Sequence, residues 1–141
     1  VTDAFLELMA ITVWGELDAL VVDAPPGIGD EILDVLRFMP EAEVIVVVNA
    51  SLLALDVAAR FARTISTTGG SSARRKVHFI ENMADGEKPA ATVRDRASEC
   101  GCRVIATLPY DSDYESRLGS ITELRDSPMM SGIQDAIDAI F

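Results

Sequence analysis

Residues 23–30, which read Asp-Ala-Pro-Pro-Gly-Ile-Gly-Asp, gather groups suited to phosphate and magnesium within one short stretch. Asp23 closes the apolar run ALVVD, and a carboxylate at the end of a strand in an open α/β sheet faces the ligand crevice. It can hold magnesium through water, since magnesium takes few protein ligands. Gly27 has no Cβ, so its N–H can approach a terminal phosphate, and Asp30 is expected to cap the next helix. The stretch predicts a nucleotide site, with a stiff strand-to-helix turn as the alternative.

Other side chains that are capable of chemistry have structural interpretations. His78, the single histidine, lies in an apolar run without a catalytic partner, which favours a packing role. Cys100 and Cys102 fall at a predicted helix end and strand start, where Cys100 is expected to be a buried structural thiol. A metal-binding Cys-Gly-Cys pair is the alternative. A solvated acidic turn, rather than an ion site, is expected from Asp111, Asp113 and Glu115.

Short apolar runs alternate with helical patterns along the chain. The runs cover residues 19–23, 44–48, 76–80 and 103–107. Continuous runs that are rich in valine and isoleucine are typical of strands covered on both faces, as in a parallel sheet. The sequence therefore predicts an α/β fold with a doubly wound, mostly parallel sheet and helices on both faces, in a single domain over residues 1–141.

The segments between these runs have the helical period. Apolar stripes predict helices over 30–39, 54–65 and 90–100, and Gly101 is placed to end the third in a left-handed conformation. The last helix is expected to start with Ser127 as cap and Pro128 at its first position. Its core-facing stripe is expected to be Met130, Ile133, Ile137, Ile140 and Phe141.

The composition limits the environments and the partners that are compatible with this protein. Twelve basic against 23 acidic side chains give a net charge of −11, which repels nucleic acid and anionic membranes over roughly 10 Å. No apolar run approaches the roughly 18–20 residues of a membrane span, and no signal segment opens the chain. Two closely spaced cysteines fit a reducing compartment. These features predict a cytoplasmic protein that binds neither nucleic acid nor membrane.

Residues 14–30, WGELDALVVDAPPGIGD, resemble the signature of the Mrp/Nbp35 family. Members of that family are P-loop ATPases that carry iron–sulfur clusters, and they are related to MinD and ParA. Three later segments, 51–57, 79–83 and 108–111, follow in a similar order. The resemblance implies a P-loop NTPase-like fold of the SIMIBI class, with ATP and magnesium as ligands. It also implies a homodimer that serves iron–sulfur cluster assembly, or transfer to acceptor proteins.

The resemblance assigns roles to four residues. Asp23 corresponds to the acidic residue behind the magnesium ion, and Gly27 to the glycine of the switch segment that senses the γ-phosphate. Asn82 matches an asparagine that bonds the adenine edge, and an amide suits adenine because it both donates and accepts. Pro109 lies in the stretch that lines the base. Without the resemblance, Asn82 is interpreted as a turn residue at a strand end.

Two parts of the family pattern are missing from the sequence. It contains no G-x-x-x-x-G-K-[ST], the loop whose backbone N–H groups cradle phosphates, so we expect no ATP hydrolysis by this chain alone. We interpret the chain as the carboxyl-terminal part of a longer protein whose fold is incomplete at the amino-terminal end; the alternative is a second chain that completes it. The residues after Met83, ADGEKPAA, contain no Cys-x-x-Cys, so the cysteine spacing does not support a bound cluster.

These absences leave two other functions open. One is a non-catalytic interaction or regulatory module that has lost the phosphate loop and the cluster cysteines. The other is a MinD-like positioning ATPase. The last predicted helix carries Asp135 and Asp138 rather than a basic face, which counts against membrane attachment of that kind.

Overall fold

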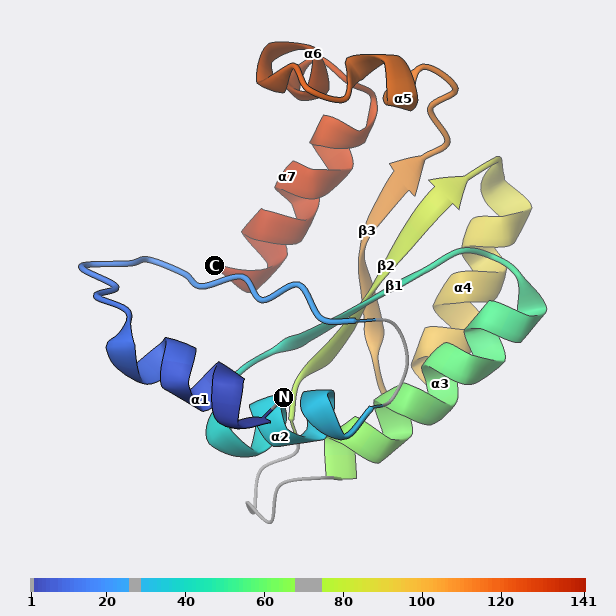
Figure 1. The fold of residues 1–141 in the computed structure, drawn as a ribbon. Helices are drawn as coiled ribbons and strands as arrows, with labels where there is room; N and C mark the ends of the chain where they lie inside the picture. Colours follow the sequence, from blue (N-terminus) through green and yellow to red (C-terminus); the bar gives the residue numbers. More distant parts are fainter. Residues whose placement is uncertain (1, 26–28, 68–74) are drawn as a thin grey trace. The chain divides into compact units, whose positions relative to one another are not determined.

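The computed structural model describes residues 2–25, 29–67 and 75–141, and the chain divides into two compact units, residues 1–42 and 43–141. The first unit contains helices α1 (Thr2–Ile11) and α2 (Asp30–Phe38), which contact each other (Figure 1). Two side chains bond back to α1 where it ends. Thr12 Oγ1 donates to Leu8 O at 2.6 Å, and Trp14 Nε1 donates to Met9 O at 3.2 Å.

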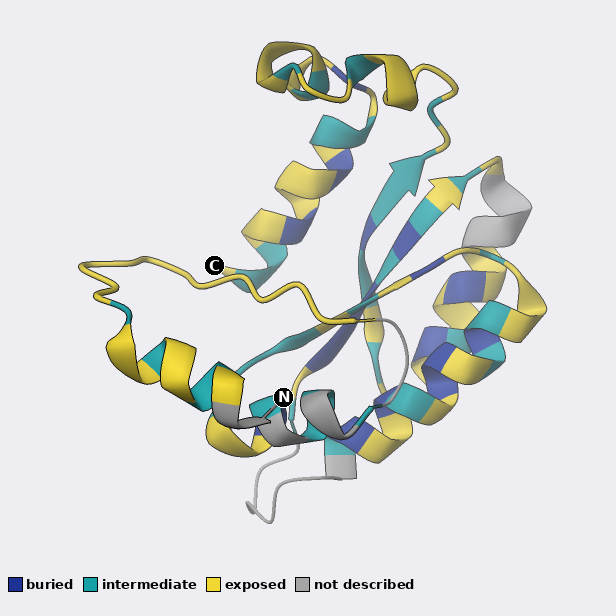
Figure 2. Ribbon diagram, in the orientation of Figure 1, coloured by how far each residue is buried: buried dark blue, intermediate teal, exposed yellow. Residues whose placement is uncertain are grey.

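Residues 13–25 contain neither helix nor strand, so the strand expected over residues 19–23 is wrong. Val21 is 90% exposed, and Figure 2 shows this segment as exposed along its length. A strand forms where a neighbouring strand takes up its backbone N–H and C=O groups. The strands in the described part of the chain pair only with one another, so the apolar run has no such neighbour.

The second unit is built on a parallel sheet of three strands in the order β1-β2-β3. The strands are β1 (Val44–Val48), β2 (Val77–Ala84) and β3 (Arg103–Pro109). In register, Ile45 faces His78, and His78 faces Arg103. The outer edges of β1 and β3 pair with no described strand. The predicted α/β class with a parallel sheet is confirmed.

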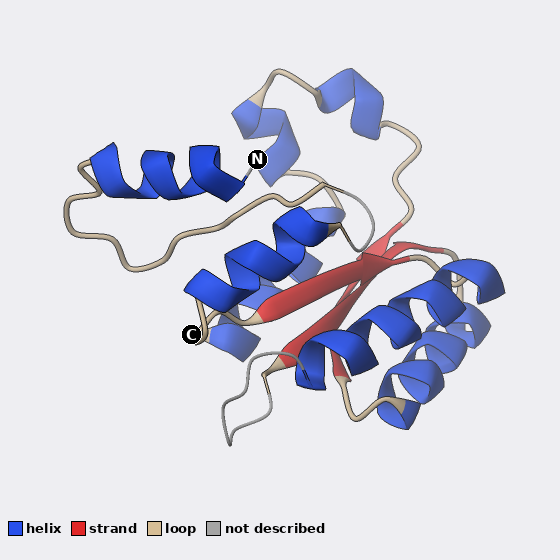
Figure 3. Ribbon diagram, turned by 60° about the horizontal axis from the view of Figure 1, so that its bottom comes forward, coloured by secondary structure: helices blue, strands red, loops and turns tan. Residues whose placement is uncertain are grey.

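Helices cover both faces of this sheet (Figures 1 and 3). The two helices on one face are α3 (Leu52–Thr67) and α4 (Glu87–Glu99). On the other face lies α7 (Met129–Ile140), which follows the short helices α5 (Tyr114–Arg117) and α6 (Ile121–Arg125). The largest fully buried apolar side chains are Phe79, Leu55, Ile65 and Val93. Gly101 follows α4 with φ +73°, the left-handed conformation that the sequence predicted.

The face of α7 that packs on the sheet differs from the predicted one. Its buried residues are Gly132 and Ala136. A Cβ at position 132 would lie 2.6 Å from Thr107 O, so the helix backbone approaches β3 more closely than a side chain would allow. Because small residues set this contact, larger members of the predicted stripe stay exposed: Ile133, Ile137 and Phe141.

Candidate functional site

The carboxyl ends of β2 and β3 bring two predicted site residues to one edge of the sheet. Asn82 lies near the end of β2, and Pro109 ends β3. Ala84 is the register partner of Pro109, and the Tyr110 N–H donates to Ala84 O at 3.0 Å. Ligands bind beyond this edge in open α/β sheets. The structure therefore places Asn82 and Pro109 where the sequence expected a ligand, and their contacts with a base stay predictions.

Asn82 is fixed by an unusual turn of the backbone. Met83 has φ +57°, and its N–H donates to Asn82 Oδ1 at 2.9 Å. A residue other than glycine in this region of φ carries a conformational cost, which other contacts must offset. The bond engages one lone pair of Oδ1 and leaves the second lone pair for another donor. Asn82 Nδ2 makes no hydrogen bond to any described residue.

The edge also presents apolar surface. Met83 is 60% exposed and Tyr110 is 63% exposed, and they follow Asn82 and Pro109 directly. Aromatic rings stack on flat ligands with little loss of conformational freedom. Tyr110 was not among the predicted site residues. Its place directly after Pro109, at the end of the last strand, was the signal in the sequence.

The acidic turn after β3 is only partly solvated. The side chain of Asp111 is 5% exposed and pairs with Arg117 of α5, so the expectation of a solvated carboxylate is wrong at this residue. Asp111 Oδ1 also accepts from the Asp113 N–H at 3.0 Å. Asp113 has a side chain that is 71% exposed, as expected. The ion pair between Asp111 and Arg117 holds the chain in place just beyond Pro109. The sequence alone does not show that Arg117 lies close to Asp111.

Glu81 is a buried carboxyl group that sequence reasoning missed. It is 1% exposed within β2, and Thr107 Oγ1 donates to its Oε2 at 3.3 Å. Its Oε1 has no hydrogen-bond partner among the described residues. The only signal in the sequence was an acidic residue that ends an apolar run. The group lies one residue before Asn82, inside the unit rather than on its surface.

The predicted phosphate and magnesium residues belong to the first unit. Asp23 is exposed in the segment without helix or strand. Gly27 lies outside the described residues. The described part of the chain contains no group of three or more His, Cys, Asp or Glu arranged to hold a metal ion. The roles of Asp23 and Gly27 therefore stay predictions.

The cysteines and the histidine are engaged in local contacts. Cys100 is buried, and its Sγ donates to Ala97 O at 3.1 Å, which confirms a structural thiol. Cys102 Sγ donates to Cys100 O at 3.8 Å, and neither cysteine forms a disulfide. His78 is buried, and its Nε2 lies 2.8 Å from Glu43 Oε2. None of the three contacts forms a nucleophile and base pair.

The predicted packing role of His78 agrees with its burial inside the second unit.

Among the residues that the structure describes, no helix has the length and apolar character needed to cross a membrane.

The three-stranded parallel sheet with helices on both faces makes the second unit an α/β structure, a class in which ligands generally bind beyond the carboxyl ends of the strands. The family model of the NUBPL iron-transfer P-loop NTPases matches residues 1–140, and the chain belongs to this family. Iron–sulfur cluster carrier proteins are among its relatives. The protein from Mycobacterium tuberculosis is 35% identical over 103 residues, which are 73% of this chain and 26% of the relative.

Two further organisms have similar proteins of the same description. The relative from Saccharolobus solfataricus is 38% identical over 106 residues, with 70% of this chain and 36% of the relative covered. The relative from Pseudomonas fragi is 31% identical over 115 residues, with 77% of this chain and 40% of the relative covered. The chain thus spans between about a quarter and two fifths of the length of these relatives. The resemblance read from residues 14–30 is confirmed.

Proposed function

We propose that the protein binds ATP and acts in iron–sulfur cluster assembly or transfer. The observation that carries the proposal is the shared position of Asn82 and Pro109 at the carboxyl edge of the sheet, in a chain that belongs to the NUBPL iron-transfer family. The relatives are described as iron–sulfur cluster carrier proteins, which supports the cluster as the cargo rather than a resident group.

The residues at the carboxyl edge fit the base end of a nucleotide. Asn82 offers the Nδ2 donor and the second lone pair of Oδ1, and the carbonyl side of the amide is held by the Met83 N–H at 2.9 Å. Pro109 gives a flat apolar wall, and the exposed ring of Tyr110 follows it. An adenine ring would be bonded at its edge by the amide and stacked on its face by the aromatic ring.

The residues that we propose for the phosphate end of the nucleotide belong to the first unit. Asp23 would hold magnesium through water, and Gly27 would present its N–H to the terminal phosphate. Magnesium supplies charge neutralisation along the phosphates when it is bound. The sequence holds no phosphate-loop motif, so we propose that residues outside this sequence supply the phosphate cradle. We also propose that the active form is a homodimer.

The cysteines of this chain do not suit a cluster as ligands. Cys100 is buried with its Sγ directed at backbone oxygens, and Cys102 is bonded to the Cys100 carbonyl. We therefore propose that thiolates from outside residues 1–141 hold the cluster, and that an acceptor protein receives it. Cysteines that form no disulfide are consistent with the reducing cytoplasm, which is the compartment we propose.

Nucleotide binding by the full product of the native reading frame tests this function. We expect saturable ATP binding in calorimetry, and Asn82→Ala to weaken it roughly three- to tenfold, the effect of one lost hydrogen bond. The variant is also expected to lose preference for ATP over GTP, because Asn82 contacts the base and not the phosphates. Gln134→Ala, which removes an amide that bonds Asp138 on α7, is the matched control.

Two results would overturn the proposal. One is the absence of saturable ATP binding in the full product, which would instead favour a non-catalytic interaction module. The other is equal ATP affinity and equal base preference in Asn82→Ala and Gln134→Ala. Iron and sulfide analysis after anaerobic reconstitution tests the cargo separately, because a product that binds ATP and retains no cluster would remove only the iron–sulfur part.

A further inference from the structure

The outer edge of β3 lies at the base of a groove in the second unit. The groove has a volume of about 250 Å³, and the residues that line it are Arg94 of α4, Val104, Ile105, Ala106 and Thr107 of β3, and Asp135 of α7. Because α4 and α7 cover opposite faces of the sheet (Figure 3), a groove that touches both helices follows the outer edge of β3. This edge pairs with no strand in the described part of the chain. The groove is therefore a slot with a strand edge at its base and a helix on either side.

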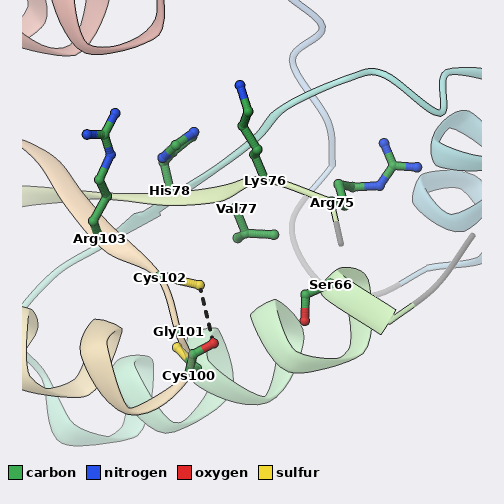
Figure 4. Close-up of a pocket in the computed structure, with 9 residues that line it drawn as sticks. All are labelled: Ser66, Arg75, Lys76, Val77, His78, Cys100, Gly101, Cys102 and Arg103. Atoms are coloured by element: carbon green, nitrogen blue, oxygen red, sulfur yellow. Dashed lines mark hydrogen bonds between the residues drawn. The ribbon is translucent and has the colours of Figure 1, made fainter. Parts of the chain in front are cut away.

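Helix α7, which forms one wall of the slot, is held against β3 at two points. Gly132 brings the helix backbone close to Thr107, and Arg103 Nη2 donates to Ala139 O at 2.9 Å. In Figure 4 the side chain of Arg103 leaves the sheet on the side opposite to Val77, which is the side that α7 covers. This wall of the slot is therefore fixed in place on the strand.

The two walls carry opposite charges that the described part of the protein leaves unpaired. Arg94 is exposed on α4, next to the fully buried Val93, and Asp135 is exposed on α7. Neither charged side chain forms a hydrogen bond or an ion pair with a described residue. Arg96 on the same helix differs, because its Nη1 donates to Glu99 Oε2 at 2.7 Å. Arg94 and Asp135 are therefore the charges that a ligand in the slot would meet.

A strand edge recognises another extended chain. Its backbone N–H and C=O groups bond to those of an added strand, and the side chains beside the edge select the sequence. Successive side chains of a strand point to opposite faces, so an added segment directs every second side chain toward α4 and the others toward α7. Acidic side chains fit beside Arg94, and basic side chains fit beside Asp135. The residues of β3 that line the slot span roughly 13 Å, which accommodates a short segment.

A second copy of this chain fits the slot poorly. Two β3 strands would pair edge to edge around a two-fold axis perpendicular to the sheet, which brings the faces that carry α4 together and the faces that carry α7 together. Both Arg94 side chains then lie on one face and both Asp135 side chains on the other, so neither copy offers the opposite charge. The net charge of −11 on each copy adds to the repulsion.

We propose that the outer edge of β3 binds an extended segment of a partner protein in which acidic and basic side chains alternate. The segment adds a further strand to the sheet, with its acidic side chains beside Arg94 and its basic side chains beside Asp135. The surface goes beyond the proposed nucleotide function and uses none of the residues assigned to the nucleotide. The two proposals are therefore tested independently.

Fluorescence anisotropy with the full product of the native reading frame tests the surface. The probe is a short labelled peptide in which glutamate and lysine alternate. Its control is a peptide of the same composition, with all glutamates placed before all lysines. We expect saturable binding of the alternating peptide, and binding of the control that is weaker by roughly three- to tenfold, because side chains of one sign then face both walls.

Charge reversal on each wall locates the peptide. Arg94→Glu makes both walls acidic, so the alternating peptide should lose roughly three- to tenfold in affinity and a peptide that alternates lysine with threonine should become preferred. Asp135→Lys makes both walls basic and should shift the preference to a peptide that alternates glutamate with threonine. Arg125→Glu is the matched control, because it changes the net charge equally on the exposed surface of α6, outside the slot. Circular dichroism checks that each variant is folded.

Blocked peptide amides test whether the backbone is recognised. Two versions of the alternating peptide are methylated at the backbone nitrogen, one at every glutamate and the other at every lysine. Alternate N–H groups of a strand point to opposite edges, so only one of the two versions has its methyl groups toward β3. That version is expected to lose binding, and the other version is expected to keep it.

Three results would overturn the proposal. The first is equal binding of the alternating peptide and the control peptide of the same composition, or saturable binding of neither. The second is an unchanged peptide preference in Arg94→Glu and Asp135→Lys relative to Arg125→Glu. The third is equal binding of the two methylated peptides, which would show that the edge of β3 does not pair with the peptide backbone.

Discussion

The carboxylate of Glu43 makes the stability of this protein depend on pH. It accepts a hydrogen bond from Lys76, which lowers the pKa of Glu43 below its ordinary 4.5; partial burial opposes the shift, and His78 adds to it. The unfolded chain therefore binds a proton at this residue at a higher pH than the folded chain does. The stabilising contribution is present above the unfolded pKa and is lost as the pH falls through the folded pKa.

Glu43→Gln is expected to remove this acid sensitivity. Between about pH 6 and pH 3, the free energy of unfolding of the native protein should fall further than that of the variant, by less than about 1 kcal/mol, because Lys76 is largely exposed. Urea unfolding at each pH measures the difference. Glu115→Gln is the control, since the Glu115 carboxylate makes no ion pair among the described residues. Parallel pH profiles for the native protein and Glu43→Gln would contradict this.

The candidate site was predictable from the sequence only in part. Asn82 and Pro109 each follow an apolar run, and parallel strands bring their carboxyl ends to one edge, so their proximity follows from the fold class. The ion pair between Asp111 and Arg117 does not follow from the fold class, because it depends on how the chain turns after β3. The burial of Glu81 was also not predicted, because a charged residue gives no sign in the sequence that its side chain faces the interior.

At the level of elements, helix α7 depends on a glycine. Gly132→Ala would place a Cβ 2.6 Å from Thr107 O and 2.7 Å from Leu108 Cδ2. The first of these contacts is with backbone, so the helix must move away from β3, at a cost of roughly 1–3 kcal/mol. Alanine normally stabilises a helix interior by about 1 kcal/mol relative to glycine, so a net loss of stability would report the contact itself.

Chemical denaturation of Gly132→Ala beside Ser131→Ala provides the measurement. Ser131 is the exposed neighbour on the same helix, and its replacement changes helix propensity without adding volume against the sheet. A lower unfolding midpoint is expected for Gly132→Ala alone. A midpoint equal to or above that of the native protein would show that α7 has room for a methyl group.

The strands and helices differ in how far the sequence predicted them. The runs at 44–48, 76–80 and 103–107 became β1, β2 and β3 because each has a parallel neighbour and covered surface. The run at 19–23 is also mostly apolar, but no described strand pairs with it, and it remains irregular. For α7, the helix was predicted and its buried face was not, because periodicity favours large apolar residues while close packing here requires small ones.

At the scale of the whole molecule, the segment over residues 13–25 is the expected point of attack by proteases. It contains no helix or strand, and Val13 and Val21 are 95% and 90% exposed. Thermolysin cleaves beside apolar residues, so it should cut this segment before it cuts the helices of the second unit. Mass spectrometry of a brief digest identifies the first products.

Val21→Asp serves as the comparison, because it removes one exposed cleavage site and no buried contact. It should slow the first cut without changing later ones. The expectation is contradicted if α3 or α4 is cut while residues 13–25 are still intact.

The outer strands β1 and β3 each have one edge that pairs with no strand in the described part of the chain, and the backbone groups of such an edge can accept another strand. We expect the net charge of −11 to oppose the joining of two copies along these edges in dilute buffer. This repulsion is screened beyond roughly 10 Å at 0.1 M salt, and it weakens further as the ionic strength rises. High salt is therefore expected to promote association of this chain along the edges of β1 and β3 that the described strands leave unpaired.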